Sequence, residues 1–272
     1  MAETIEYVIS FIFILAGSVI FLYGFNRMHK YRLIQDTPRS KIRSMAMGIV
    51  ELHGNVEAER YIKTPFSQTD CVYYRYKIEE YRKHTQTDSK GNKTTTYSWE
   101  TISTGERRIP FFAKDDTGKV PVEPEGAEYN VSVKKVFLQK AGLFGAIGTI
   151  VNVLKDWDSN KQPDINVSSW GLLPIDTKSH ISFGNSVGDR KYYEYYIEPE
   201  EQLFVLGTAA NKPQTSEVLI RKGENEPTFI ISDKSEKDLL GALKWKMVGS
   251  FVFGAVLIIA GVMMLLQFTG NI

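Results

Sequence analysis

Two long apolar blocks, one near each end of the chain, constrain the fold more than any other feature of the sequence. Tyr7–Phe25 contains 19 residues without a charged side chain, and Met247–Phe268 contains 22. About 20 helical residues at roughly 1.5 Å each cross a hydrocarbon core of roughly 30 Å, so both blocks are long enough to span a bilayer. We predict transmembrane helices over residues 5–25 and 247–268, with a domain over residues 26–246 between them.

The basic residues beside the two blocks predict how the chain is oriented in a membrane. Six Lys and Arg residues occur between positions 27 and 43, and four Lys residues between positions 234 and 246. No basic residue precedes the first block or follows the second. Because positive residues favour the cytoplasmic side, we expect a multi-pass protein of the cell membrane, with the central domain cytoplasmic and both termini outside. The alternative, a cleaved signal peptide over the first block, is disfavoured because no basic region precedes the block.

The composition is that of a folded protein, and it gives no sign of nucleic-acid binding. Hydrophobic residues make up 43% of the chain and charged residues 24%, as in ordinary globular domains. The 33 basic side chains are nearly balanced by 32 acidic ones, so the strongly basic surface of a nucleic-acid-binding domain is not expected. The single cysteine, Cys71, excludes an intramolecular disulfide or a cysteine-rich zinc module within these residues.

Alternation of apolar and polar residues predicts that the central domain is rich in strands. Apolar and polar residues alternate over residues 72–79, and Thr94–Thr104 is rich in residues that favour strands. Turn residues around Gly91 join these two segments into a long hairpin with a polar tip. Further strands are predicted over Tyr192–Ile197 and Leu203–Leu206. The fold class is therefore a membrane protein in which two transmembrane helices flank a β-rich α+β soluble domain.

Two helices are predicted inside this domain. Ala141–Leu154 is uncharged and too short to span a membrane, which predicts a helix over about residues 138–157. This helix either packs in the core or lies at the membrane interface, where Lys155 and Trp157 would meet headgroups; both interpretations remain. A second helix is predicted over about residues 233–246, with Asp233 as its N-cap and no obvious loop before the second span.

The sequence contains no recognisable catalytic or metal-binding motif. The four histidines, His29, His53, His84 and His180, are far apart, and none has a ligand-like partner three or four residues away. Cys71 begins an apolar strand and is interpreted as a buried structural thiol. We therefore predict no catalytic residue, no cofactor and no metal.

One tripeptide resembles a catalytic motif. Asp116-Thr117-Gly118 is the tripeptide that aspartic proteases use, and a dimer supplies the second carboxylate in such sites. Here charged neighbours surround it, namely Lys114, Asp115 and Lys119, which is typical of an exposed hairpin turn rather than of a screened catalytic carboxylate.

An ordered series of short segments resembles a known domain family. The segments are residues 48–54 (GIVELHG), 65–66 (PF), 71–74 (CVYY), 78–80 (IEE), Trp99, 110–111 (PF), 115–118 (DDTG), 122, 124–127 (PEGA), 197, 205–207 (VLG), 229–232 (FIIS) and Glu236. This order is similar to that of the beside-a-membrane, or GIDE-type, domain of mitochondrial membrane ubiquitin ligases and their prokaryotic relatives. The resemblance covers most of residues 48–240, and the family shares the layout of span, domain, span.

The chain departs from these ligases in one respect. In the ligases a RING finger follows the second span, and its cysteines and histidine bind two zinc ions that recruit the ubiquitin-conjugating enzyme. The single cysteine, Cys71, precedes the second span, so a RING is not expected here. The resemblance therefore implies a membrane domain that serves in sensing or partner binding, and not ubiquitin transfer.

Two functional hypotheses follow from this sequence. The first is a membrane-anchored, non-catalytic binding, sensing or scaffold module whose partners are the lipid bilayer and an unidentified protein, with the oligomeric state open. The second is a membrane-bound enzyme whose site is assembled from dispersed side chains: Glu79, Glu80, Glu198, Tyr74 and Tyr195. Converging carboxylates in an enclosed pocket would favour the enzyme, whereas an open groove would favour the module.

Overall fold

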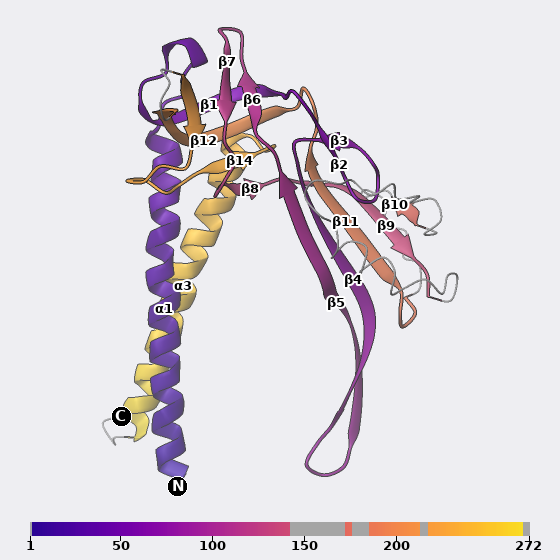
Figure 1. Cartoon of the computed structure of the whole chain (residues 1–272). Coiled ribbons are helices and arrows are strands. Elements are labelled where there is room, and N and C mark those ends of the chain that lie inside the picture. Colours follow the sequence, from indigo (N-terminus) through magenta and orange to yellow (C-terminus); the bar gives the residue numbers. More distant parts are fainter. Residues whose placement is uncertain (1, 142–171, 176–184, 213–216, 269–272) are drawn as a thin grey trace.

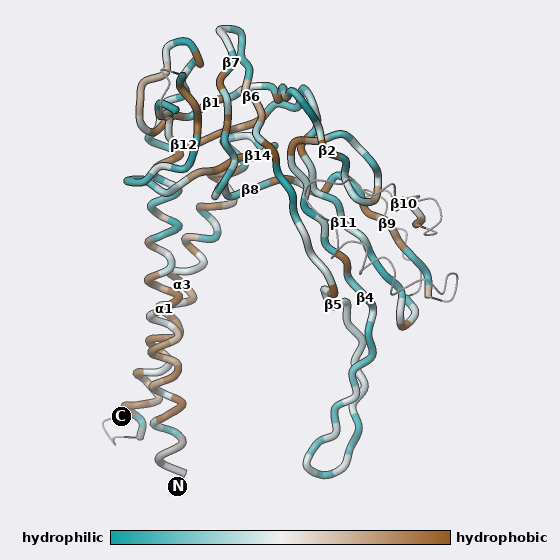
Figure 2. Tube along the Cα trace, viewed as in Figure 1, coloured by the Kyte–Doolittle hydropathy of each residue, from teal (hydrophilic) through white to brown (hydrophobic). Residues whose placement is uncertain are grey.

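Two long helices run side by side and carry a β-rich domain at one end. The computed structural model describes residues 2–141, 172–175, 185–212 and 217–268 (Figure 1). Helix α1 covers Ala2–Asp36 and helix α3 covers Glu236–Phe268. Both are long and apolar enough to cross a membrane, and Figure 2 shows that their apolar residues dominate the half away from the domain. The predicted class, two membrane helices flanking a β-rich domain, is confirmed.

Small residues let the two helices approach closely. A Cβ atom at Gly17 would lie 2.8 Å from the backbone oxygen of Gly254, and one at Gly261 would lie 2.7 Å from Cγ1 of Ile14. Close contact of this kind drives helix association in membranes, where water does not push apolar surfaces together. At the domain end of the apolar region, the Arg27 guanidinium donates hydrogen bonds of 2.7 Å to the backbone oxygen of Lys246 and to Ser250 Oγ.

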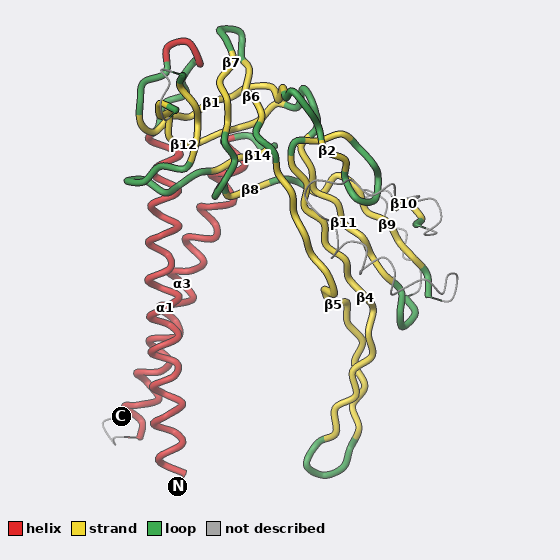
Figure 3. Tube along the Cα trace, viewed as in Figure 1, coloured by secondary structure: helices red, strands yellow, loops and turns green. Residues whose placement is uncertain are grey.

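The first β-unit lies at one end of the helices (Figure 3), and its strand pairings close it into a small barrel. Its strands follow the order β1 (Gly48–Glu57), β6 (Phe111–Lys114), β7 (Lys119–Val122), β13 (Val218–Arg221) and β12 (Gln202–Asn211). The sheet closes on itself because β1 also pairs with β12. This pairing is antiparallel and extends from Gly48 opposite Ala209 to Asn55 opposite Gln202. Two short strands, β14 (Ile230–Ser232) and β8 (Glu128–Asn130), extend the sheet beyond β12.

The second β-unit is a five-stranded antiparallel sheet that projects from the barrel. Its order is β10 (Leu173–Ile175), β9 (Val133–Gln139), β11 (Arg190–Ile197), β4 (Tyr73–Thr87) and β5 (Lys93–Arg108). The long β4–β5 hairpin agrees with the sequence prediction. Its turn is closed by Asp88, whose Oδ1 accepts hydrogen bonds from the backbone of Lys90 and Asn92, and Gly91 adopts a positive φ of 85°.

A continuous apolar core joins the barrel to the five-stranded sheet. The Tyr73 ring of β4 stacks on the Tyr129 ring of β8, with centroids 3.6 Å apart. Two further short elements lie at the edges, the strand pair β2 (Ile62–Lys63) with β3 (Asp70–Cys71), and a 3-10 turn over Ile42–Ser44. The two sheets therefore form one folded domain with a shared interior.

A second, smaller apolar cluster fixes the barrel to the helices. Strand alternation on β12 turns Leu203 and Val205 toward the barrel interior and Phe204 and Leu206 outward. The outward pair packs with residues from the domain ends of both helices and from β14; the buried members are Ile34, Phe204, Leu206, Ile230 and Leu239. The barrel is thus attached to both helices by burial of apolar surface.

The two helices predicted inside the domain differ from the structure at their first residues. The first was expected to begin near residue 138, but Leu138 and Gln139 are the last residues of strand β9, where they pair with β10 and β11. Residues 142–157 of this prediction lie outside the described residues. The second helix begins at Glu236 and not at Asp233, because Ser235 is the capping residue and its Oγ accepts a hydrogen bond from the Asp238 backbone. Asp233 instead accepts hydrogen bonds from Ser132.

Candidate functional site at the junction of barrel and helices

Three potential metal-ligating side chains meet where the barrel contacts the second helix. Glu51 and His53 are two residues apart on β1, so both face the outside of the barrel while Leu52 faces its core. Glu236 is the first residue of α3. One potential ligand atom from each of these residues lies within 4.8 Å of the other two. The fold therefore brings together three side chains that are separated by up to 185 positions in the sequence.

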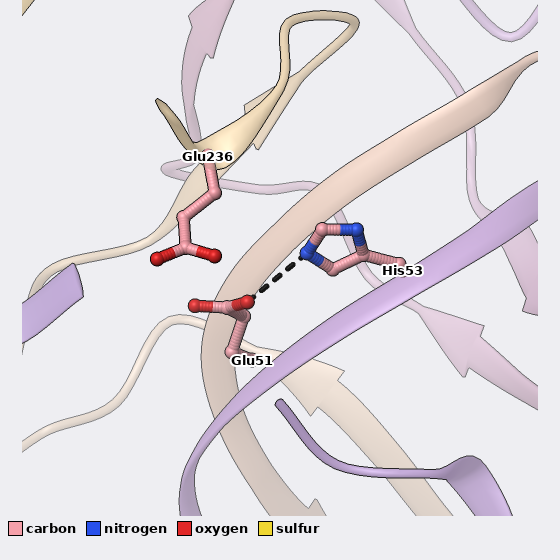
Figure 4. A group of neighbouring side chains, drawn as sticks. All are labelled: Glu51, His53 and Glu236. Atoms are coloured by element: carbon pink, nitrogen blue, oxygen red, sulfur yellow. Dashed lines mark hydrogen bonds and ion pairs between the residues drawn. The ribbon is translucent and has the colours of Figure 1, made fainter. Parts of the chain in front are cut away.

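The arrangement leaves one carboxylate oxygen without a partner. His53 Nε2 lies 3.0 Å from Glu51 Oε1, and Figure 4 shows the carboxylates of Glu51 and Glu236 facing each other on the other side of this contact. Within the part of the chain that the structure describes, Glu51 Oε2 is buried and has no hydrogen-bond partner. The Glu51 side chain is only 1% exposed, so water does not solvate that oxygen freely.

The electrostatics of the group follow from burial and from nearby charges. Burial, with the negative charge of Glu236 in addition, raises the pKa of the Glu51 carboxyl to about 7, and the Arg39 guanidinium opposes this shift. Burial and Arg39 together lower the pKa of His53, against the pull of Glu236. At neutral pH the His53 ring is therefore predominantly neutral, which is the form that binds metal ions.

Arg39 belongs to a segment that the fold holds beside the site. This segment follows α1 and pairs with β1, since Arg39 forms a bridge with Glu51 and the Ser40 backbone donates a 2.8 Å hydrogen bond to the Glu51 backbone oxygen. A polar cavity of about 320 Å³ opens next to His53. It is lined by Arg39, Lys41, His53, Gly54, Asn55, Lys114, Asp115, Asp116, Glu200 and Gln202. The cavity is partly open, so solvent can reach the imidazole of His53 through it.

Most of the dispersed side chains of the enzyme hypothesis are engaged with neighbours of their own. Glu80 is paired with Arg190 at 2.7 Å and with Arg82 at 2.9 Å, and Glu79 is paired with Lys77 at 2.7 Å. Tyr195 lies under the Arg75 guanidinium, 4.4 Å from ring centroid to Cζ. Glu198 follows the end of β11, and Tyr74 is buried in the main core. Ion pairs hold Glu79 and Glu80, a cation–π contact holds Tyr195 and core packing holds Tyr74, whereas Glu198 is exposed.

The other residues considered from the sequence have structural roles where the structure describes them. His29 lies 2.9 Å from Glu226, and His84 lies 3.0 Å from Glu100; His180 is outside the described residues. Burial raises the pKa of the Cys71 thiol, whose Sγ donates to the Ile62 backbone oxygen. Glu100 also pairs with Arg82, so His84 lies at the end of a surface ion-pair network on the β4–β5 hairpin.

The Asp-Thr-Gly tripeptide forms the β6–β7 turn. Asp115 Oδ1 accepts hydrogen bonds from the Thr117 backbone and hydroxyl and from the Gly118 backbone. Asp116 forms an ion pair with Lys41 and is largely exposed. This is the geometry of a hairpin turn held by an Asp side chain, as the charged neighbours indicate.

The sequence carries a local signal for only two members of the Glu51–His53–Glu236 group. Metal ligands on a helix recur three or four residues apart, whereas residues 48–57 form a strand. On a strand the relevant spacing is two, and Glu51-Leu52-His53 has it. Glu236 has no sequence signal linking it to this pair, since its approach depends on how α3 docks.

These features define the class of the protein: a β-domain attached to a pair of membrane helices through a mixed apolar and polar junction. The family model described as "GIDE: E3 Ubiquitin ligase" matches residues 79–265, more than half of the 272-residue chain. The chain belongs to the GIDE family, as the resemblance in the sequence indicated. Searches of curated proteins and of solved structures found no match.

Proposed function

We propose that this chain is a membrane-anchored, non-catalytic binding, sensing or scaffold module of the GIDE type. Its partners are the lipid bilayer and a protein, and nucleic acid is not among them. The central domain lies on the cytoplasmic side and both termini lie outside, as the distribution of basic residues predicts.

The observation that carries this proposal is the attachment of the barrel to both helices. Ile34 of α1 and Leu239 of α3 belong to the same buried apolar cluster as Phe204 and Leu206 of the barrel. A change in how the helices pack in the bilayer therefore alters the surface on which the barrel rests, and a partner on the barrel alters the helices in turn. This coupling suits a module that senses the membrane or holds a partner beside it.

The family description names ubiquitin ligases, and two observations favour a non-catalytic role for these residues. The 272 residues contain one cysteine, Cys71, which is buried, whereas a RING requires several cysteine and histidine ligands. The carboxylates of the enzyme hypothesis, Glu79 and Glu80, are held in ion pairs with basic side chains. Both observations support binding rather than group transfer.

A ubiquitin-transfer assay tests the catalytic part of this proposal. The full chain in lipid nanodiscs is incubated with ubiquitin, ATP, the activating enzyme and a panel of conjugating enzymes. We expect no conjugates beyond those formed without the chain. Conjugates that require the chain would contradict the proposal.

Photo-crosslinking in cells tests the binding part. A crosslinking amino acid is placed at Tyr97, which is 51% exposed on the β4–β5 hairpin, or at the exposed Val187. A protein adduct of discrete size is expected from at least one position, and it should persist in the Glu79→Gln, Glu80→Gln double variant. The same probe at lipid-facing Tyr23 is the control. Absence of any adduct specific to the domain positions would contradict a protein-binding role.

A further inference from the structure

We propose that Glu51, His53 and Glu236 form a binding site for one divalent transition-metal ion, Zn²⁺ or Mn²⁺, that links the barrel to the second helix. The donors are one imidazole nitrogen and two carboxylate oxygens. This donor set suits divalent first-row metals, since imidazole binds them well and carboxylates neutralise their charge. The proposal replaces the expectation of no metal that the sequence spacing gave, and it goes beyond the proposed binding function.

The geometry is close to that of a metal centre. One ligand atom from each of the three side chains lies within 4.8 Å of the others. Around a metal with bonds of about 2.1 Å, tetrahedral ligands are roughly 3.4 Å apart. Glu236 is half-buried at the start of α3, so its side chain is less confined than that of Glu51, and the proposal requires it to move toward the other two ligands when the ion binds. Three protein ligands leave a coordination position for water or for a small ligand.

The buried oxygen of Glu51 is the independent observation that points to a cation. Among the residues that the structure describes, Glu51 Oε2 has no hydrogen-bond partner, and its side chain is 1% exposed. It lies beside the carboxylate of Glu236 (Figure 4). Two facing carboxylates with a buried free oxygen are unfavourable unless a proton or a cation lies between them. A metal ion satisfies that oxygen, the second carboxylate and the imidazole together.

The surroundings permit entry of an ion and hold the ligands in place. The polar cavity of about 320 Å³ beside His53 supplies the path from solvent. The His53 ring is held edge-on against Phe204, with centroids 5.6 Å apart. Glu51 is held on the β-ladder through its pairing with Leu206 of β12. Arg39 carries a positive charge near the site, but its side chain is exposed, so solvent and salt screen that charge.

A bound ion would connect two parts that are otherwise joined mainly by apolar contacts. Glu51 and His53 belong to the barrel, and Glu236 begins the helix that continues into the membrane. Coordination therefore stabilises the barrel in its docked position. Metal availability would set how rigidly the domain is held against the helix pair.

The experiment uses the full chain in detergent micelles after treatment with a chelator. ZnCl₂, MnCl₂ or MgCl₂ is added, the excess is removed by dialysis, and bound metal is measured by elemental analysis. In parallel, the thermal midpoint is followed during titration. We expect about one equivalent of Zn²⁺ or Mn²⁺, and a midpoint raised by roughly 5–10 °C at a free-ion concentration 100-fold above the dissociation constant. Mg²⁺ should give no shift.

Two variants locate the site. Glu236→Gln keeps the size of a half-buried side chain and should lower bound metal to below about 0.2 equivalents and abolish the midpoint shift, because one of three ligands is lost. Glu226→Gln is the matched control, since Glu226 pairs with His29 at 2.9 Å without a third ligand in the described chain. This control should bind like the unaltered protein. Equal binding by the Glu236→Gln variant, binding lost equally in the control, no bound metal, or an equal shift with Mg²⁺ would each overturn the proposal.

Discussion

The helix pair and the β4–β5 hairpin both extend from the barrel in the same general direction, but their surfaces are opposite in character (Figures 1 and 2). The helices carry exposed apolar side chains such as Phe11, Leu22 and Val256. Residues 85–98 at the far end of the hairpin are all exposed and mostly polar. The surface of the helix pair is thus suited to lipid, and that of the hairpin is suited to water.

This difference in surface character decides which of the two elements enters the membrane. Polar side chains and the edges of a two-stranded ribbon lose hydrogen bonds with water in hydrocarbon, so the hairpin tip cannot enter it. The apolar helix surfaces are favoured there. We therefore expect the five-stranded sheet to tilt in a bilayer, so that the hairpin points away from the hydrocarbon into water and not along the helices as in Figure 1.

The largest expected effect is at the barrel–helix junction. Leu206→Asp places a charge in a fully buried position of the small apolar cluster, and we expect a loss of about 3–5 kcal/mol in the free energy of unfolding. Tyr97→Asp, on the exposed hairpin, should change it by less than about 0.5 kcal/mol. Chemical denaturation of the full chain in micelles measures both. Similar losses in the free energy of unfolding from the two substitutions would show that Leu206 is no more important for stability than an exposed hairpin residue.

A smaller effect is expected within the helix pair. A Cβ atom at Gly254 would lie 2.8 Å from the backbone nitrogen of Phe21, whereas one at Gly249 would meet nothing within 4 Å beyond its own helical turn among the described residues. Gly254→Ala should therefore force the helices apart and lower the free energy of unfolding by about 1–3 kcal/mol. Gly249→Ala should be neutral, or stabilising by up to about 1 kcal/mol, because alanine favours the helix. Equal effects on unfolding would indicate that the helices do not pack through Gly254.

The sheet that carries the hairpin contains a buried carboxyl, and its effect should depend on pH. Glu194 is buried on β11, where its Oε1 accepts hydrogen bonds from the backbones of Phe66 and Ser67. Burial raises the pKa of Glu194 above its ordinary value of 4.5, although those bonds and Lys135 oppose the shift. The folded state therefore holds this proton to higher pH than the unfolded state does, so stability is lost as pH rises through the folded-state pKa.

The Glu194→Gln variant tests this pH dependence, because glutamine keeps an acceptor oxygen but does not ionise. Below pH 4 the two proteins should unfold at similar temperatures. Toward neutral pH the variant should become the more stable of the two. A difference that does not change with pH would mean that Glu194 does not titrate in this range.

The smallest expected effect on stability comes from single cysteine substitutions, which test directly whether the hairpin lies in water and α1 in lipid. Ser89→Cys at the exposed hairpin tip should react with a membrane-impermeant maleimide in sealed inside-out vesicles, and Val19→Cys in α1 should not. Cys71 is fully buried and should contribute little background labelling. Labelling of Ser89→Cys in intact cells instead would place the domain on the outer side and contradict the proposed topology.

The sequence by itself determined the features that depend on local pattern. Uninterrupted apolar length predicts membrane helices, because each turn must satisfy its own backbone in lipid. Alternation over residues 72–79, with turn residues around Gly91, predicts the long hairpin, because side chains on a strand face opposite sides in turn. The family resemblance also follows from local segments, and the family match confirms it.

Only the tertiary structure decided the features that depend on distant residues. Closure of the barrel rests on β1 pairing with β12, about 150 positions away. The start of α3 is fixed by Ser235, because Asp233 is engaged by Ser132 of another segment. The group of Glu51, His53 and Glu236 forms because apolar burial docks α3 on the outer face of the barrel. Docking of this kind depends on the shape of the assembled surfaces, which no local pattern encodes.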